Sequence, residues 1–291
     1  MDKNKPLFHY TSVEGFLGIV SSKTIWATNI LYLNDASEFN YSKELLRNEL
    51  FEIRKKGFNI NGNIETSIEP RFFEIVEENI DKLIPSQNFS FFVCSFSEEK
   101  DLLSQWRGYC SEGIGFSLGF SKKLLIQCAE QSKFALKPCL YDEEAQAQSI
   151  RDLIKKTSDR FRTEIKNSSQ IGKAWDTMGQ ILAVDFMLEF IALAPTFKHH
   201  KFCEEKEWRI VASLQMNNVN ELIKFRSGRS MIIPYIEIYL PTKDRNLTMD
   251  EIVVGPTTDD LLSMASVEMI LRGKEIEYNE LSYSTIPYRP W

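Results

Sequence analysis

The sequence predicts a single α+β domain over residues 1–291, in which a mixed or antiparallel β-sheet packs against helices. Short apolar segments with strand character recur along the chain, and helical periodicity replaces them between residues 142 and 197. The sequence lacks the regular alternation of strands and helices that would indicate a parallel sheet. It also contains no repeat or low-complexity linker that would divide the chain. Residues 142–197 are therefore expected to be a helical insertion within the domain.

The first half of the chain is expected to open with a strand, a helix and a second strand. The helix, residues 13–21, follows Thr11 or Ser12 as its N-cap, and Glu14 places a carboxylate in its first turn. A longer helix is expected over residues 38–54. The strands predicted in this half are residues 7–10, 24–27, 89–96 and 113–120.

The second half begins with two amphipathic helices and then returns to strands. Ile150 and Ile154 mark one helix, and Ile181 and Leu182 mark the next. A last helix follows the Gly-Pro turn after the Val-rich strand. The strands predicted in this half are residues 137–141, 208–213, 231–239, 252–254 and 275–279.

Composition limits the classes of function. A net charge of -6 argues against broad electrostatic binding of nucleic acid. No signal-peptide pattern follows the polar N-terminus, and the apolar region 171–197 contains charges that favour a buried helix over a membrane span. The five cysteines are scattered without a Cys-x-x-Cys pair, which is typical of reduced thiols. We expect a cytoplasmic protein with no membrane partner.

His9 is the first candidate for a binding role. It stands alone in an apolar strand that runs into a Thr-Ser helix cap. A neutral imidazole there can bind a ribose hydroxyl or a carboxamide, or it can be a core residue bonded to a backbone carbonyl. Because strand side chains alternate, Tyr10 is expected to face away from the pocket that His9 would line.

A second group of polar and aromatic residues follows the strand at 89–96. It contains Gln105, Trp106, Arg107 and Tyr109. Arginine and glutamine beside aromatic rings suit a phosphate and a ring of a nucleotide. The alternative is a short helix with Trp106 in the core and Arg107 in a salt bridge.

The third group is acidic and lies at the start of a later strand. Alternation places Glu205, Glu207 and Arg209 on one face. Charges of both signs are typical of a solvated edge, but a carboxylate on a buried strand can also stabilise a cationic transition state. Glu207 is favoured for that role because it lies nearest the apolar residues. Arg229, in a glycine-containing loop, is a further candidate phosphate ligand.

Two other motifs carry less weight. Residues 115–119 fit the Gly-x-Ser-x-Gly pattern of α/β-hydrolases, but apolar residues alternate straight through Ser117 and predict an extended strand. His199, His200 and Cys203 are residue types that bind metals. No second Cys or His cluster accompanies them, and a zinc site needs three or four protein ligands, so we expect no bound metal.

Taken in order, short blocks of the chain resemble a bacterial family catalogued as the domain-of-unknown-function 2971 family. The blocks extend over nearly the whole sequence, and the ordered set is more specific than any one of them. They are Phe8-His9-Tyr10-Thr11-Ser12, Ile25-Trp26-Ala27-Thr28, Leu33-Asn34-Asp35-Ala36-Ser37-Glu38, Cys94-Ser95-Phe96-Ser97, Leu103-Ser104-Gln105-Trp106-Arg107, Gly115-Phe116-Ser117-Leu118-Gly119-Phe120, Glu205-Lys206-Glu207-Trp208-Arg209, Val254-Gly255-Pro256 and Ile286-Pro287.

The first block also resembles ADP-ribosyltransferases of the His-Tyr-Glu type. That resemblance implies a split β-sheet and NAD as the substrate. His9 fits the histidine that contacts the nicotinamide ribose, and Glu207, with Glu205 beside it, fits the glutamate that aids transfer. The aromatic that stacks on nicotinamide is open between Trp26 and Tyr109. The residues expected to bind NAD are Thr11, Trp26, Gln105, Trp106, Arg107, Tyr109 and Arg229.

The function that this resemblance implies is consumption of NAD by a transferase or glycohydrolase. By analogy with its relatives, the protein would be a toxin or phage-defence effector with an antitoxin or defence-system partner and an unidentified acceptor. Two alternatives are open. One is a module that binds a nucleotide or a protein without catalysis. The other is a metal-dependent nucleic-acid enzyme that uses Asp35, Glu38 and Glu207.

Overall fold

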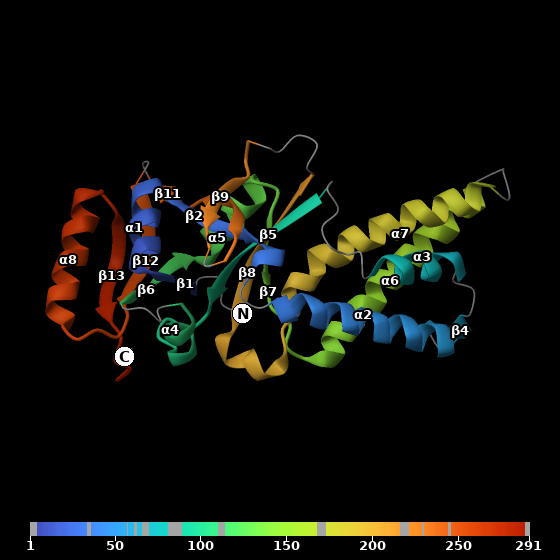
Figure 1. Cartoon of the computed structure of the whole chain (residues 1–291), viewed down its shortest axis with the longest axis horizontal. Coiled ribbons are helices and arrows are strands. Elements are labelled where there is room, and N and C mark those ends of the chain that lie inside the picture. The colour runs from blue at the N-terminus through green and yellow to red at the C-terminus, as the bar shows by residue number, and fades with distance from the viewer. Residues whose placement is uncertain are drawn as a thin grey trace.

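The fold combines a large sheet, covered by helices, with a helical arm that projects from one end of it (Figure 1). The computed structural model describes residues 5–33, 36–56, 58–60, 63–65, 70–80, 89–109, 114–167, 173–215, 221–228, 230–243 and 246–288. The strands are Pro6–Ser12 (β1), Thr24–Asn29 (β2), Phe58–Ile60 (β3), Asn63–Glu65 (β4), Phe89–Ser97 (β5), Gly115–Ser121 (β6), Ala135–Pro138 (β7), Glu207–Gln215 (β8), Lys224–Ser227 (β9), Ile232–Tyr239 (β10), Thr242–Lys243 (β11), Asn246–Val254 (β12) and Glu277–Tyr283 (β13).

Helices separate these strands at irregular intervals, as the sequence predicts. The α-helices are Val13–Ser22 (α1), Ala36–Lys56 (α2), Pro70–Ile80 (α3), Leu103–Tyr109 (α4), Lys122–Gln131 (α5), Glu143–Asn167 (α6), Lys173–Leu193 (α7) and Asp260–Gly273 (α8). The 3-10 helices are Ile30–Tyr32 (η1), Ala194–Thr196 (η2) and His200–Glu205 (η3). The predictions did not include α3 and α5, and they placed the last strand a few residues too early.

Within the described part of the chain, eleven strands form one sheet and β3 pairs with β4 in a separate hairpin. The main order is β11-β12-β6-β1-β5-β2-β10-β9, with β13 beside β12, β8 beside β5 and β7 beside β8. The β12–β13 pair, connected through α8, is parallel, and the other pairs of the sheet are antiparallel. The prediction of an α+β fold with a mixed, mostly antiparallel sheet is confirmed.

The sheet divides along β5. One edge of β5 pairs with β8 over its whole length, and β1 and β2 share the other edge. β1 meets β5 where Phe8 faces Ser97, and β2 meets it where Thr28 faces Val93. Between these contacts His9 of β1 bonds to β5 through its side chain, whose Nδ1 is 2.9 Å from the Ser95 carbonyl oxygen. The sheet therefore has two branches that separate at His9.

The two faces of the sheet bury different cores. On one face, alternate residues such as Leu7, Cys94 and Leu118 form a hydrophobic core with α1, α5 and α8. On the other face, Phe91 of β5 packs against the helical arm and Tyr10 packs against α4. Because paired strand residues point to the same side, the register fixes the face on which each candidate side chain lies.

The arm visible on the right of Figure 1 contains α2, α3, α6 and α7, which share one hydrophobic core. The helices predicted in residues 142–197 are α6 and α7, and they pack against α2 and α3 from an earlier part of the chain. The segment Gly179–Thr196 has the length and hydropathy of a membrane span, and half of it is buried inside the protein. Phe186 and Phe190 are fully buried there, as in a core helix.

The Gly-x-Ser-x-Gly motif lies in the middle of a strand, as its alternation predicts. Ser117 sits in β6, paired with Tyr10 on one side and Val253 on the other. Its side chain is fully buried. A nucleophile must be exposed at a sharp turn between a strand and a helix, so the structure excludes a hydrolase elbow at this position.

Candidate functional site

A small cavity lies where the sheet divides, on the face opposite His9. Four predicted residues, Gln105, Tyr109, Glu205 and Glu207, line it together. Its open volume is about 10 Å³, which is roughly what one water molecule needs. The full lining is Phe8, Tyr10, Ser95, Phe96, Ser97, Gln105, Tyr109, Glu205 and Glu207.

Strand pairing and a tight turn bring the two glutamates to this cavity. Glu207 begins β8 and pairs with Ser97 of β5. The preceding residue, Lys206, has φ 41°, a left-handed conformation that ends η3 and starts the strand. Glu205 therefore lies in η3 and not in the strand, and the Ser97 hydroxyl holds it there by donating to its backbone oxygen at 2.6 Å. The predicted alternation holds from Glu207 onward.

Glu207 belongs to a compact cluster of five charged side chains. It accepts hydrogen bonds from Lys198 at 2.5 Å and from Arg209 Nε at 2.7 Å. Arg209 also binds Glu38 at 2.7 Å, and Lys198 also binds Glu205 at 2.6 Å. Three carboxylates thus face two cations, and one negative charge in this cluster is unbalanced.

Burial makes these charges interact strongly. Lys198, Glu207 and Arg209 are each at most 7% exposed. Burial alone would raise the pKa of Glu207, but the Arg209 and Lys198 charges and their hydrogen bonds outweigh it and lower the pKa to about 2. Glu205 differs: burial raises its pKa above the usual value in spite of Lys198. The cavity therefore contains one carboxylate with a lowered pKa and one that takes up a proton more readily.

The low pKa of Glu207 predicts a specific dependence of stability on pH. The carboxylate has a pKa of 4.5 as its reference value and about 2 in the fold. Its ionised form therefore stabilises the fold above about pH 4.5, and this contribution is lost as the pH falls toward about 2. We expect the difference in free energy of unfolding between wild type and Glu207→Gln to stay constant above about pH 5 and to shrink below it.

Urea denaturation of both proteins at several pH values measures this difference. Comparing the two proteins cancels the contributions of the carboxylates that lie outside the cluster. A difference that stayed constant down to about pH 3 would contradict the predicted low pKa.

His9 does not share the cavity with Glu207. The register places His9 with Leu118 on the α1 face, whereas Glu207 and Ser97 lie on the opposite face with Tyr10. The expectation that His9 and Glu207 line the same pocket is therefore wrong. Burial lowers the pKa of His9, and its neutral ring donates from Nδ1 to the Ser95 carbonyl oxygen, which connects β1 to β5. Tyr10, expected to face away, lines the cavity instead.

The other predicted NAD-binding residues lie at several places. Trp106 is fully buried, and its Nε1 donates to Asp101 at 2.7 Å. This position agrees with the alternative interpretation, in which Trp106 is a core residue. Arg107 is exposed on α4 with its guanidinium 5.5 Å from the centre of the Tyr288 ring. Neither lines the cavity.

The remaining predicted residues lie outside the cavity or cannot be placed. Trp26 is 44% exposed and packs against Tyr235, with ring centroids 4.4 Å apart. Thr11 lies near the end of β1, close to the start of α1, and does not line the cavity. Arg229 and Asp35 lie outside the described residues.

Sequence reasoning missed Lys198 and gave Glu38 a different role. Lys198 follows an apolar segment and is the only charge between residues 190 and 200, which is a signal for a buried, paired lysine. Glu38 was assigned to a metal-dependent alternative, but it binds Arg209 and Lys198. Two cations thus occupy the positions around Glu38 and Glu207 that this alternative reserves for a metal.

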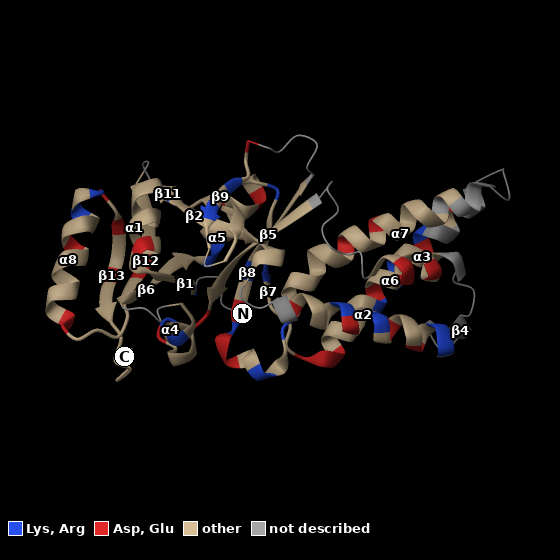
Figure 2. Cartoon of the chain, viewed as in Figure 1, with Lys and Arg blue, Asp and Glu red and all other residues tan. Residues whose placement is uncertain are grey.

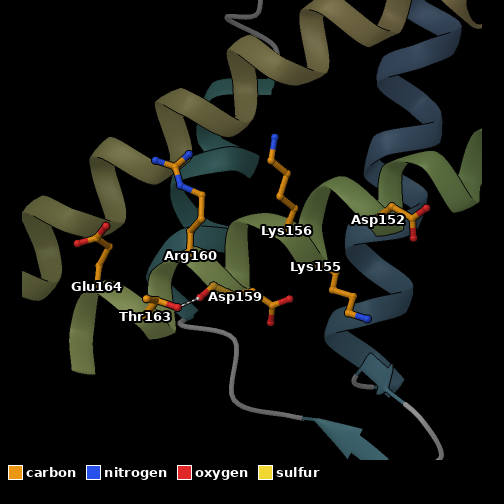
Figure 3. Close-up of a pocket in the computed structure, with 7 residues that line it drawn as sticks. All are labelled: Asp152, Lys155, Lys156, Asp159, Arg160, Thr163 and Glu164. Atoms are coloured by element: carbon orange, nitrogen blue, oxygen red, sulfur yellow. Dashed lines mark hydrogen bonds between the residues drawn. The ribbon is translucent and has the colours of Figure 1, made fainter. Parts of the chain in front are cut away.

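A larger hollow on the helical arm has a different character. Its lining residues all come from α6: Asp152, Lys155, Lys156, Asp159, Arg160, Thr163 and Glu164 (Figure 3). Lys156 pairs with Glu189 and Arg160 pairs with Asp185, both on α7. All four side chains are more than a third exposed, and charges of both signs mix along the arm (Figure 2). This hollow is a solvated, ion-paired helix surface.

Comparison with known proteins finds a family match for part of the chain. Residues 105–210 match the family described as "Protein of unknown function (DUF2971)". These residues are a DUF2971 family domain. The DUF2971 match runs from α4 to β8 and includes Gln105, Tyr109, Glu205 and Glu207. No curated protein and no solved structure matches the chain. The resemblance to ADP-ribosyltransferases therefore gains no support from these comparisons.

Proposed function

We propose that the cavity at the division of the sheet binds the nicotinamide ribose of NAD and that the protein transfers or hydrolyses ADP-ribose. The observation that carries the proposal is the convergence of Gln105 and Tyr109 from α4 with Glu205 and Glu207 from η3 and β8 on one cavity. These groups are nearly a hundred residues apart in sequence. Polar groups from distant segments that converge on one cavity are typical of a binding site.

The lining chemistry suits nicotinamide. Tyr109 lines the cavity and is one of the two candidates that the sequence left open for stacking on nicotinamide, and Tyr10 supplies a second aromatic ring. Gln105, whose side chain ends in an amide, is 9% exposed and lines the cavity. A carboxamide can pair with such an amide through both its oxygen and its nitrogen. The proposed ligand would therefore gain a polar partner in Gln105.

The electrostatics suit a reaction that develops positive charge. When the bond between ribose C1′ and nicotinamide breaks, its electron pair stays on nicotinamide and the ribose becomes cationic. The unbalanced negative charge of the Glu38, Glu205 and Glu207 cluster would stabilise that cation. An acceptor hydroxyl, amine or water then bonds to C1′ and releases a proton. Glu205 is the better base, because its pKa is raised while that of Glu207 is about 2.

Ligand binding requires the cavity to open. Its volume of about 10 Å³ holds no ring, and the Glu207 carboxylate is fully engaged. Tyr109 is the lining residue best able to move, since it is 46% exposed at the end of α4. We propose that rotation of Tyr109 opens the cavity and brings its ring against the nicotinamide that enters.

Release of nicotinamide from NAD by the purified protein tests this proposal. We expect the wild-type protein to release nicotinamide. We expect Tyr109→Ala to raise the KM for NAD about tenfold, which is the loss of affinity that one missing aromatic contact causes. The matched control is Tyr239→Ala on β10, because Tyr239 is 72% exposed and does not line the cavity. Equal KM values for the Tyr109→Ala and Tyr239→Ala proteins would contradict the proposed site.

A binding module without catalysis is the second candidate function. Full engagement of the Glu207 carboxylate by Lys198 and Arg209 favours it, because that carboxylate is already neutralised by two partners. NAD binding measured by calorimetry, with no nicotinamide released in the presence of candidate acceptors, would support this function and exclude the enzymatic one.

A further inference from the structure

Two histidines and a glutamate gather outside the cavity, where η3 meets the start of α6. Glu143 is the first residue of α6, His199 caps η3 and His200 begins it. One ring nitrogen of each histidine and a carboxylate oxygen of Glu143 lie within 4.8 Å of one another. We propose that Glu143, His199 and His200 bind a divalent transition metal, with Zn²⁺ as the best fit. This proposal is independent of the proposed function.

The two imidazoles are already placed side by side. Their ring centroids are 4.3 Å apart and their planes differ by 30°. His199 Nδ1 accepts the backbone N–H of Lys201 at 3.3 Å, and the Tyr41 ring packs edge-on against it at 5.9 Å. This long hydrogen bond is weak enough to be exchanged for a metal bond. His199 is thus the ordered ligand around which the other two assemble.

Glu143 and His200 supply the adjustable ligands. His200 Nδ1 lies 3.6 Å from a carboxylate oxygen of Glu143. Ligands about 2.0–2.1 Å from a tetrahedral zinc are roughly 3.3 Å from one another, so this pair needs little movement. Both side chains are more than half exposed, and they can rotate to close the rest of the distance.

The donor set selects the class of metal. Two imidazole nitrogens and one carboxylate with an open position form a set that zinc uses at sites accessible to water. Mg²⁺ and Ca²⁺ prefer oxygen ligands throughout. A bound ion would connect η3 to α6, beside Lys198 and at the opposite end of η3 from Glu205.

Titration of the full chain with Zn²⁺, in competition with a chromophoric chelator, tests the proposal. We expect one equivalent to bind, and we expect His200→Ala and Glu143→Gln each to weaken the Kd at least about tenfold. The matched control is Cys203→Ser, which removes an exposed thiol from the same 3-10 helix and should leave the Kd unchanged. Circular dichroism checks that each variant is folded.

Two outcomes would overturn the proposal. One is an unchanged Kd in both His200→Ala and Glu143→Gln. The other is loss of binding in Cys203→Ser, which would assign the metal to the thiol. Substitution with Co²⁺ gives an independent readout: the expected spectrum has ligand-field bands without a sulfur-to-cobalt charge-transfer band, and a strong charge-transfer band would contradict the histidine site.

Discussion

Replacement of Glu207 by glutamine is expected to reduce the rate of nicotinamide release from NAD by at least about 100-fold, the usual cost of removing one aligned electrostatic group. Glutamine has nearly the same shape and retains an oxygen that can accept from Arg209. It removes the negative charge that would face the cationic ribose. The initial rate at saturating NAD measures the effect, because charge that stabilises only the transition state changes kcat more than KM.

The control must separate lost chemistry from lost stability. Glu189→Gln removes one carboxylate of an exposed ion pair on α7 and is expected to keep the wild-type rate. Urea denaturation of Glu207→Gln shows the conditions under which it is fully folded, and the rate is compared only there. Equal rates for the folded Glu207→Gln and Glu189→Gln proteins would limit Glu207 to a structural role.

Replacement of Arg209 by alanine is expected to lower the free energy of unfolding by about 3–5 kcal/mol, the cost of leaving a buried charge without its partner. Arg209 is 5% exposed and binds Glu207, Glu38 and the Pro195 carbonyl oxygen. Without it, three carboxylates would share Lys198 as their cation in this cluster. Equilibrium urea unfolding, followed by tryptophan fluorescence, measures the change.

The matched control is Arg160→Ala, which breaks an ion pair with Asp185 on the helical arm. Both partners there are more than a third exposed, so the expected cost is below about 1 kcal/mol. A similar small cost for Arg209→Ala would contradict the view that the buried cluster holds β8 to α2. The comparison sets a buried arginine with two ion-pair partners against an exposed arginine with one.

Local sequence patterns predicted features that depend on neighbouring residues. Alternation through Ser117 predicted a strand in place of a hydrolase turn, and β6 has that form. Alternation after Glu207 placed Glu207 and Arg209 on one face, and their shared ion pair confirms this. The sequence also indicated that His9 and Tyr10 face opposite sides, because side-chain direction in a strand has a period of two.

The sequence favoured the side of His9 as the one that faces the pocket, whereas the cavity lies on the side of Tyr10. That choice depends on the register of β1 against β5 and of β5 against β8, which places Tyr10 with Glu207 and leaves His9 on the other face. Periodicity along one strand contains no information about the pairing of another.

By itself, the sequence determined the α+β class, the strands that carry the candidate residues and the polar segments that meet at the cavity. Only the tertiary structure decided that Lys198 and Glu38 complete the charge cluster and that Glu143 joins the two histidines. The physical reason is that a pairwise charge or ligand contact acts over a few ångströms in space. Residues far apart in the chain reach that distance only after the helices and strands have packed.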